Sequence, residues 1–305
     1  MSAASLLTLA LVLGLAPLLP GLTVRTKSLI AGRRGPPVFQ LYADLAKLLR
    51  KGAVYSTTTG PMFRLAPALF AGTTLAAATL LPLDGRAAPV AFVGDVVAFA
   101  GLLALGRFLL VLAALDTGSS FEGMGASREV AFASLIEPGL FLCFAALAAA
   151  TAGSSLTAML GERLLHTWTS AAPALVLVGG SLFVLMLAEN GRVPVDDPAT
   201  HLELTMIHEV MVLDHGGPDL AFILYGGALK LALFGALVLS VLVPRAGLSP
   251  AGSALVLVGG LVVVGVAVGV VESMMARLRL TRVPQFLVAA AALSTFALML
   301  LLSAS

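Results

Sequence analysis

The chain has 305 residues, of which 59% are hydrophobic and only 11% are charged. Because soluble domains carry about 25% charged residues, this composition excludes an ordinary soluble protein and indicates a chain that lies mostly in lipid. The net charge of +2 is too small to suggest nucleic-acid binding, and the single cysteine cannot hold an iron–sulfur cluster, which takes about four thiolates.

Eight apolar segments are long enough, or nearly so, to cross a hydrocarbon core of about 30 Å, which takes roughly 20 helical residues. The first has no basic region before it and no small-residue cleavage site after Pro20, so we expect a retained span rather than a signal peptide. The sequence therefore predicts an all-α, polytopic membrane helix bundle that forms a single domain over residues 1–305. The expected spans are 3–22, 61–83, 89–115, 130–152, 168–188, 218–243, 250–271 and 283–303.

Lys and Arg residues are distributed unevenly between the connecting loops. Thirteen lie in the odd-numbered loops and three in the even-numbered loops, while Arg107 and Lys230 fall within spans. Loops rich in Lys and Arg stay in the cytoplasm, so we expect the odd-numbered loops inside and both termini outside. The pattern is that of a multi-pass protein of the cell (plasma) membrane.

The first cytoplasmic loop, residues 23–60, contains a segment with one apolar and one polar side. This pattern predicts an amphipathic helix of about fourteen residues that lies in the membrane interface, because it is too short to span. The alternative is a basic surface helix that only anchors the loop. The apolar side has Val38, Leu41, Tyr42, Leu45, Leu48 and Leu49, and the polar side has Gln40, Asp44, Lys47 and Lys51.

A few ionisable residues lie within the predicted spans or at their mouths. Each is costly at membrane depth unless it is paired or hydrated, so the group indicates an internal polar path. The alternative is that some lie near helix ends and reach the headgroups. Glu137 is expected one turn inside the fourth span, next to Pro138, where a broken helix could hold water. The group consists of Asp95, Arg107, Glu137, Lys230 and Glu272.

The loop over residues 189–217 concentrates acid in a chain that is otherwise poor in charge. Asp197 followed by Pro198 is typical of a helix start and predicts a helix over about residues 198–213. The acidic residues are Glu189, Asp196, Asp197, Glu203, Glu209 and Asp214.

His201, His208 and His215 are spaced by seven, which would place them roughly on one face of that helix. Seven residues span about 10 Å along a helix axis, too far for two imidazoles to share an ion, and the zinc-binding spacing i, i+4 is absent. We expect no metal site, and we expect these histidines to be structural or to carry protons.

Three blocks of sequence resemble one family over nearly the whole chain. It is the family of the membrane subunit 1 of respiratory complex I, with its homologues in energy-converting nickel–iron hydrogenases. The blocks are Arg34-Gly35-Pro36 with Gln40, Asp44, Lys47 and Leu48, then Gly125 to Arg128 with Glu137, and then Glu189, Arg192, Pro194 and Asp196 with Glu203-Leu204.

The resemblance is closer to the hydrogenase branch, of the formate hydrogenlyase subunit 4 type. The stretch from Val195 to Glu209 looks typical of that branch, as do Glu272-Ser273 and the segment 276–287. Quinone-reducing relatives carry further glutamates where this chain has Ala199 and His201.

The resemblance implies a non-catalytic membrane subunit of an oxidoreductase complex. It would anchor the complex and link electron transfer in a peripheral arm to proton or sodium translocation. The implied partners are hydrogenase-like large and small subunits, an iron–sulfur subunit, antiporter-like membrane subunits and the lipid bilayer. No cofactor is expected in this chain, since the partners would carry the iron–sulfur clusters and, where the large subunit binds nickel, a nickel–iron centre.

The residues and the resemblance together suggest two groups of functional side chains and no catalytic residue. Candidates for a proton path are Glu137, Asp95, Glu203, Glu209, Lys230 and Glu189. Candidates for the interface with the peripheral arm are Arg34, Asp44, Lys47, Arg128, Arg192, Asp196, Asp197, His201 and Arg279.

Two other functions remain open on the sequence. One is a quinone-binding subunit of a complex I type NADH dehydrogenase. The other is a stand-alone secondary transporter, although such proteins often consist of two repeated halves and no internal repeat is evident here.

Overall fold

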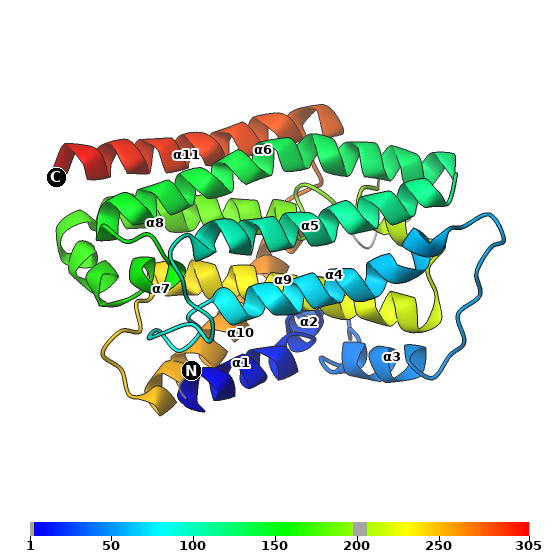
Figure 1. The fold of residues 1–305 in the computed structure, drawn as a ribbon, viewed down its shortest axis with the longest axis horizontal. Helices are drawn as coiled ribbons and strands as arrows, with labels where there is room; N and C mark the ends of the chain where they lie inside the picture. The colour runs from blue at the N-terminus through cyan, green and yellow to red at the C-terminus, as the bar shows by residue number, and fades with distance from the viewer. Residues whose placement is uncertain (1–2, 198–205, 305) are drawn as a thin grey trace.

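The computed structural model describes residues 3–197 and 206–304, and all regular elements in these ranges are helices. Seven helices are long and apolar enough to cross a membrane, namely α4, α5, α6, α8, α9, α10 and α11. They run side by side along one axis (Figure 1), which confirms the all-α membrane bundle. The elements are α1 (Ala3–Leu15), α2 (Leu18–Ile30), α3 (Gln40–Leu48), α4 (Pro61–Leu80), α5 (Asp95–Asp116), α6 (Ser120–Thr151), α7 (Leu156–Met159), α8 (Glu162–Glu189), η1 (Glu209–Val212), α9 (Gly217–Leu242), α10 (Pro250–Met274), η2 (Leu280–Arg282) and α11 (Val283–Ala304).

The first predicted span is a bent pair of helices. Helices α1 and α2 meet at 45° and together would form an eighth span, which extends to residue 30 rather than 22. The break lies at Pro17, which has no N–H to donate to the carbonyl of Leu13. Tyr225 donates to that carbonyl instead, at 3.1 Å, and Tyr42 donates to the carbonyl of Gly14 at 2.5 Å. The bend is therefore stabilised by side chains from α9 and α3.

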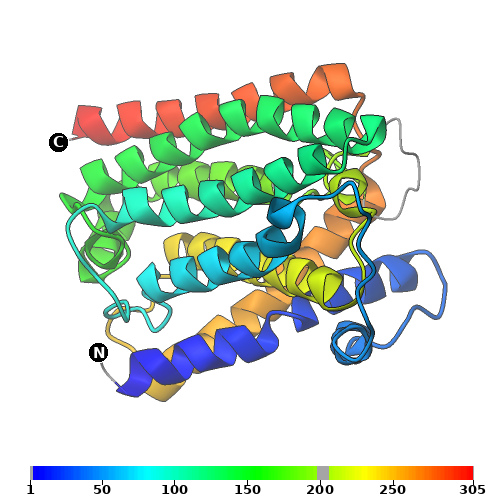
Figure 2. The same ribbon diagram turned by 45° about the vertical axis from the view of Figure 1, so that its right-hand side comes forward.

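The connecting segments gather at the two ends of the bundle. One end, here called the basic end, holds α3, η1 and η2 with the segments 31–60, 117–119, 190–197, 206–216 and 275–282 (Figures 1 and 2). The opposite end holds the start of α1, the end of α11 and the loops 81–94, 152–161 and 243–249. This alternation is the one that eight spans require. The basic end corresponds to the side that the sequence predicts to be cytoplasmic.

Two helices differ from their predicted bounds in ways that move functional residues. Helix α6 has 32 residues and begins at Ser120, ten residues before the predicted start, so it is about 48 Å long and projects beyond a core of about 30 Å. Glu137 therefore lies near the middle of α6, not one turn inside its end. Pro138 does not break the helix, whereas α8 is kinked at Ala171, two residues before Pro173.

Helix α9 forms the centre of the bundle and is the most buried of the long helices. It packs against α4, α8 and α10 (Figure 1). On one side, α2 and α10 approach closely because Gly265 and Gly269 present no side chain to α2, and the hydroxyl of Thr23 donates to the carbonyl of Gly265 at 3.1 Å. Helix α3, which falls in the predicted amphipathic segment, has nine residues instead of the expected length of about fourteen.

Candidate functional site

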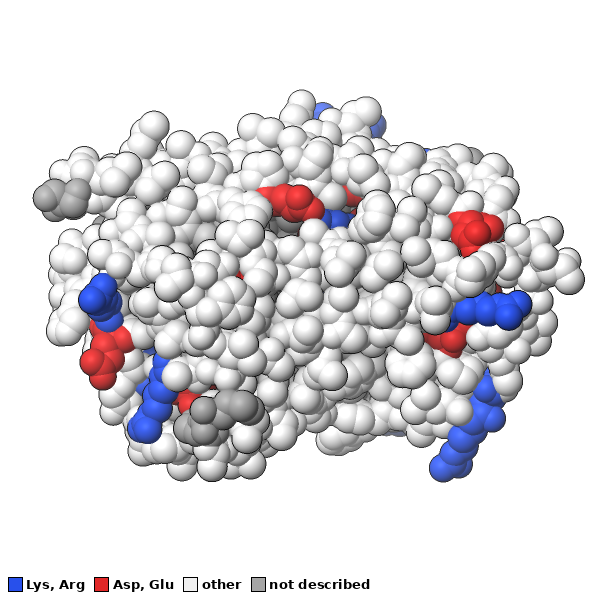
Figure 3. Space-filling view, in the orientation of Figure 1, with Lys and Arg blue, Asp and Glu red and all other residues white. Residues whose placement is uncertain are grey.

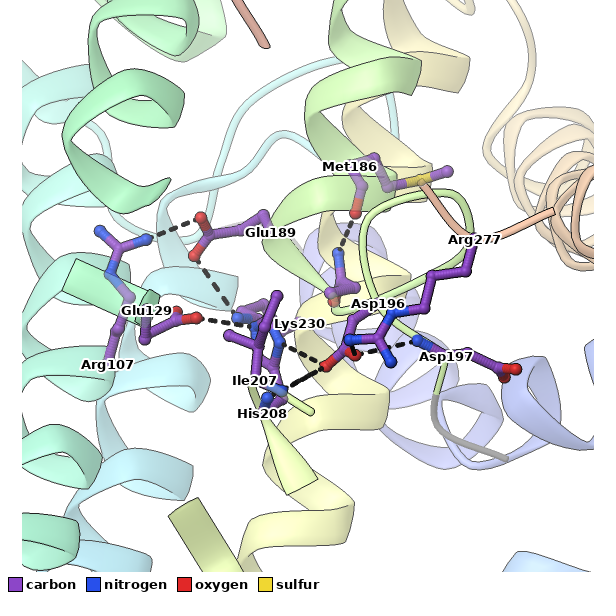
Figure 4. A network of polar contacts seen from close by, with 11 residues as sticks. Arg107, Glu129, Met186, Glu189, Asp196, Asp197, Ile207, His208, Lys230 and Arg277 are labelled. Carbon is purple, nitrogen blue, oxygen red and sulfur yellow. Dashed lines mark hydrogen bonds and ion pairs between the residues drawn. The ribbon is translucent and has the colours of Figure 1, made fainter. Parts of the chain in front are cut away.

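A buried ion network joins three helices near the basic end. Glu189, the last residue of α8, is 4% exposed and accepts from two cations. The Nη1 atom of Arg107 on α5 lies 2.7 Å from its Oε2 atom, and the Nζ atom of Lys230 on α9 lies 3.4 Å from its Oε1 atom (Figure 4). A charge at this depth is stable only when it is paired, so the three side chains depend on one another.

The network continues to Glu137 on α6. The second terminal nitrogen of Arg107, Nη2, contacts the Oε1 atom of Glu137. Unlike the other members, the Glu137 side chain is 43% exposed. Figure 3 shows that charged atoms lie mainly toward the ends of the molecule and that a small acidic patch interrupts the apolar middle. The line of alternating charges thus runs from inside the bundle to its outer face.

Two cavities flank this network. The larger has a volume of about 500 Å³, lies at the basic end and has a mixed apolar and charged lining. The smaller, about 130 Å³, lies between α5 and α6 and includes Glu137 and Glu189 in its wall. Arg107 lines both cavities, whereas Glu189 lines only the smaller one, so Arg107 is the network member that the two cavities share along their walls. The charged residues of the large cavity are Arg107, Glu129, Arg192, Asp196, His208, Glu209 and Lys230.

Asp196 organises the acidic loop from within. It is 2% exposed, and its Oδ2 atom accepts the backbone N–H groups of Ile207 and His208, both at 3.1 Å. Its Oδ1 atom lies 3.0 Å from the guanidinium of Arg277 (Figure 4). Burial alone would raise the pKa of Asp196, but the hydrogen bonds and charge of His208 outweigh it and hold the pKa below its ordinary value. Asp196 is therefore ionised at neutral pH.

His208 lies between two carboxylates. Its Nε2 atom is 3.2 Å from Glu129 on α6, and its Nδ1 atom is 3.6 Å from Asp196. Burial opposes the charged form, yet Glu129 and Asp196 together raise the pKa of His208 above its ordinary value. The two carboxylates therefore favour the imidazolium form of His208, which lies next to the large cavity.

A second, separate ion cluster closes the basic end. Glu272, at the end of α10, is buried and pairs with Lys27 at 3.0 Å and with Arg192 at 3.6 Å. Lys27 also lies 4.0 Å from Asp197. This cluster connects α2, α10 and the acidic loop by ion pairs. Because Lys27 and Arg192 balance its charge, Glu272 does not need to reach the headgroups.

The remaining proton-path candidates lie in different places. Asp95 is buried at the opposite end of α5, where its Oδ1 atom accepts the backbone N–H of Leu156 at 2.7 Å, so it is not part of the network. Glu209 lines the large cavity. Glu203 lies outside the described residues.

The predicted interface residues all belong to the basic end, apart from His201, which lies outside the described residues. Arg34, Lys47 and Arg279 are exposed. Asp44 is half-buried and accepts from Gln40 at 2.9 Å. Arg128 donates to the carbonyl of Met206 at 2.9 Å, so it stabilises the acidic loop. Whether these residues contact a partner stays a prediction.

The predicted helix over residues 198–213 is wrong in its described part, where only the short 3₁₀ helix η1 forms. The backbone N–H groups of Ile207 and His208 donate to the carboxylate of Asp196 instead of to backbone carbonyls of a helical turn. Without that helix, His208 and His215 do not share a face: His215 stacks on Phe63 with ring centroids 3.9 Å apart. Sequence reasoning also missed Glu129, although it stands eight residues before Glu137 and so on a similar side of α6.

Comparisons with known proteins identify related chains. The family model described as NADH dehydrogenase matches residues 3–303. Hydrogenase-4 component C of Escherichia coli is 35% identical over 77% of this chain and 73% of its own length. Formate hydrogenlyase subunit 4 of the same organism is 34% identical over 90% of this chain and 91% of its own length. A chain of the membrane-bound sulfane sulfur reductase, an archaeal respiratory membrane complex, shares the fold, with a TM-score of 0.84 and 18% identity over 99% of this chain and 98% of that chain.

Proposed function

The chain belongs to the NADH dehydrogenase family, and we propose that within it the protein is the membrane anchor and coupling subunit of a hydrogenase-type, complex I-like complex. In this role it links electron transfer in a peripheral arm to proton or sodium translocation in the cell membrane. Its homology to formate hydrogenlyase subunit 4 and hydrogenase-4 component C supports the hydrogenase-type assignment.

The observation that carries the proposal is the continuous ion network between the two cavities. Two unit charges about 4 Å apart interact by about 4 kcal/mol at the effective dielectric of about 20 found near protein surfaces. A change of that size at one member shifts the proton equilibrium of the next by roughly three pKa units. A charge that arrives beside Lys230 can therefore change the proton equilibrium of Glu137, because Glu189 and Arg107 connect the two residues by ion pairs.

Glu137 indicates which kind of partner lies beside the bundle. A half-exposed carboxylate in the middle of a spanning helix would cost several kcal/mol against lipid. The opening between α5 and α6 is therefore covered, in our proposal, by an antiporter-like membrane subunit that receives the coupling signal.

The basic end supports docking of the peripheral arm. Its exposed cations include Arg34, Lys47 and Arg279, and the described part of the acidic loop lies at the same end. The hydrogenase-like large and small subunits and the iron–sulfur subunit would bind here and carry the redox centres. Cys143, the one thiol of this chain, is buried in the core against Ser181 and Ser294 and is not placed to serve them.

Replacing Lys230 with Met tests the proposal. The variant removes one of the two cations that stabilise Glu189, so the network can no longer carry a charge change from the large cavity. The purified complex, reconstituted in liposomes, should transfer electrons but should translocate few or no ions per electron. The exposed Arg86, at the opposite end, offers the matched control Arg86→Met, which should behave like the wild type. An unchanged ratio of ions to electrons in Lys230→Met would reject the network as the coupling element.

A quinone-binding subunit is the second candidate, and the large cavity favours it. A volume of about 500 Å³ with a mostly apolar wall and a few polar groups is typical of sites for small organic molecules, which measure about 300–1,000 Å³. Quinone-dependent electron transfer by the purified complex, abolished by Leu224→Trp in the cavity wall, would support this function in place of the first.

A further inference from the structure

His208 is held by contacts from three parts of the chain. Glu129 of α6 pairs with its Nε2 atom, and Asp196 of the acidic loop pairs with its Nδ1 atom. Gly191, whose φ of +56° suits glycine, brings its backbone against the ring, so that a Cβ atom there would lie 2.6 Å from Nδ1. The imidazole therefore has one orientation, with a carboxylate at each nitrogen.

The orientation is fixed from the Asp196 side. That carboxylate also accepts the backbone N–H of His208, and Arg277 balances its charge at 3.0 Å. An acid that is ionised, buried and hydrogen-bonded in this way directs an imidazole but is a poor proton acceptor itself. Exchange is therefore favoured at the other nitrogen, Nε2, which lies 3.2 Å from the Oε2 atom of Glu129.

The charges around His208 connect it to the ion network. Glu129 and Asp196 favour the imidazolium, whereas the ammonium of Lys230 opposes it. Glu129 also acts electrostatically on Arg107, and the charge of His208 acts on Glu189. His208, Glu129 and Lys230 all line the large cavity. A change in the charge around Lys230 thus changes how tightly His208 holds its proton.

We propose that His208 passes protons from solvent in the large cavity to Glu129, and that the resulting change of charge on Glu129 acts electrostatically on Arg107 of the ion network, with Asp196 and Gly191 as positioning residues. In this step the Nε2–H bond of the imidazolium breaks and an O–H bond forms on Oε2 of Glu129. An ion pair becomes a neutral imidazole and a carboxylic acid, and no electrons move. Solvent that enters the cavity returns a proton to Nε2. The inference rests on the proposed coupling function.

His215 provides an internal comparison. It lies on the same loop, is 5% exposed and lines the same cavity. In the described part of the chain, no carboxylate lies within ion-pair distance of its ring, which instead stacks on Phe63. Burial lowers the pKa of His215, so it is neutral at physiological pH. A histidine can thus be accommodated in this loop without the paired carboxylates that surround His208.

The experiment compares His208→Gln with His215→Gln in the whole complex, reconstituted in liposomes with a pH-sensitive dye. Glutamine keeps hydrogen bonding but cannot titrate, so His208→Gln should lower the rate of proton uptake by about 100-fold, the usual contribution of a positioned acid or base. His215→Gln should leave the rate within about two-fold of the wild type. Electron transfer to the natural acceptor should continue in both variants.

Rescue separates proton transfer from a structural role. Free imidazole, which fits the space that His208→Ala leaves beside the cavity, should restore proton uptake in that variant with a dependence on pH that follows imidazole itself. It should have no effect on His215→Ala. Loss of uptake without rescue would overturn the relay and assign His208 a structural role.

The outcome also distinguishes this inference from the proposed function. If Lys230→Met stops translocation while His208→Gln retains uptake with an unchanged pH profile, the relay alone is rejected. If both variants translocate normally, the coupling function fails as well.

Discussion

At the scale of single residues, the charged side chains inside the bundle are stable because each one pairs with a side chain of opposite charge. Glu189 has two cations, and Arg107 has two carboxylates, so Lys230, Glu189, Arg107 and Glu137 form a chain of alternating sign with no net charge. A neutral set of this kind avoids most of the penalty of burying charge. It also means that one added or removed proton leaves a neighbour uncompensated, which is the property that a coupling element needs.

Glu137 is the member whose titration can be removed with the least disturbance. In Glu137→Gln, Arg107 keeps its pair with Glu189, so the complex should assemble and transfer electrons in detergent. Ion translocation in liposomes should fail because the outer end of the network can no longer accept a proton. The control is Glu162→Gln, an exposed carboxylate in the first turn of α8 at the opposite end. Normal pumping, or loss of assembly before any pumping defect, would contradict the proton-path role.

Part of this site can be predicted from sequence, because ionisable residues are rare in apolar spans. That rarity identified Arg107, Glu137 and Lys230 as a group but left open whether Arg107 reaches the headgroups. Their partners depend on how α5, α6, α8 and α9 pack, which no local pattern encodes. Glu129 was missed for the same reason: it lies next to Arg128 at the basic end of α6, where a charged pair is ordinarily a solvated helix end.

At the scale of elements, apolar length predicted the long helices, while their ends and breaks depend on tertiary contacts. The α1–α2 bend at Pro17 needs Tyr42 and Tyr225 from distant segments to satisfy two carbonyls. The short η1 replaces a predicted helix because Asp196, ten or more residues earlier, takes the N–H groups of Ile207 and His208. Signals for helix starts are local, and here a long-range carboxylate overrides them.

The close contact of α2 and α10 gives a prediction about stability. A Cβ atom at Gly269 would lie 2.8 Å from the carbonyl oxygen of Thr23 and 2.7 Å from Cβ of Thr26. Gly269→Leu should therefore force the helices apart and lower the free energy of unfolding by about 1–3 kcal/mol. The matched control is Gly259→Leu on the same helix, where nothing lies within 4 Å of the added atom. Thermal melts in detergent should show a lower Tm for the first variant only, and equal melts would contradict the close packing.

At the scale of the whole molecule, the two ends differ more in charge than the sequence count alone indicates. Three basic residues belong to the opposite end, but Arg245 is 2% exposed and donates to Ser240 at 2.6 Å. Burial lowers the pKa of Arg245 to about 10, so it remains charged at neutral pH while it is withdrawn from the surface. The exposed cations of that end are thus fewer, which strengthens the prediction that the basic end is cytoplasmic.

Cysteine labelling in intact cells and inverted vesicles tests this orientation. Arg33 and Arg279 are exposed at the basic end, and Leu248 is 39% exposed at the opposite end, so cysteines at these positions can react without unfolding the protein. The native Cys143 is buried and should give little background. A membrane-impermeant maleimide should label Arg33→Cys and Arg279→Cys only from the cytoplasmic side, and Leu248→Cys only from outside.

The bent α1–α2 pair needs a site of its own. If this pair did not cross the membrane, residue 6 would change sides while residues 33, 248 and 279 would not. A cysteine that replaces the exposed Leu6 tests the crossing, and it should react from outside. Labelling of residues 33 and 248 from the same face would contradict the alternation of the two ends and, with it, the eight-span topology.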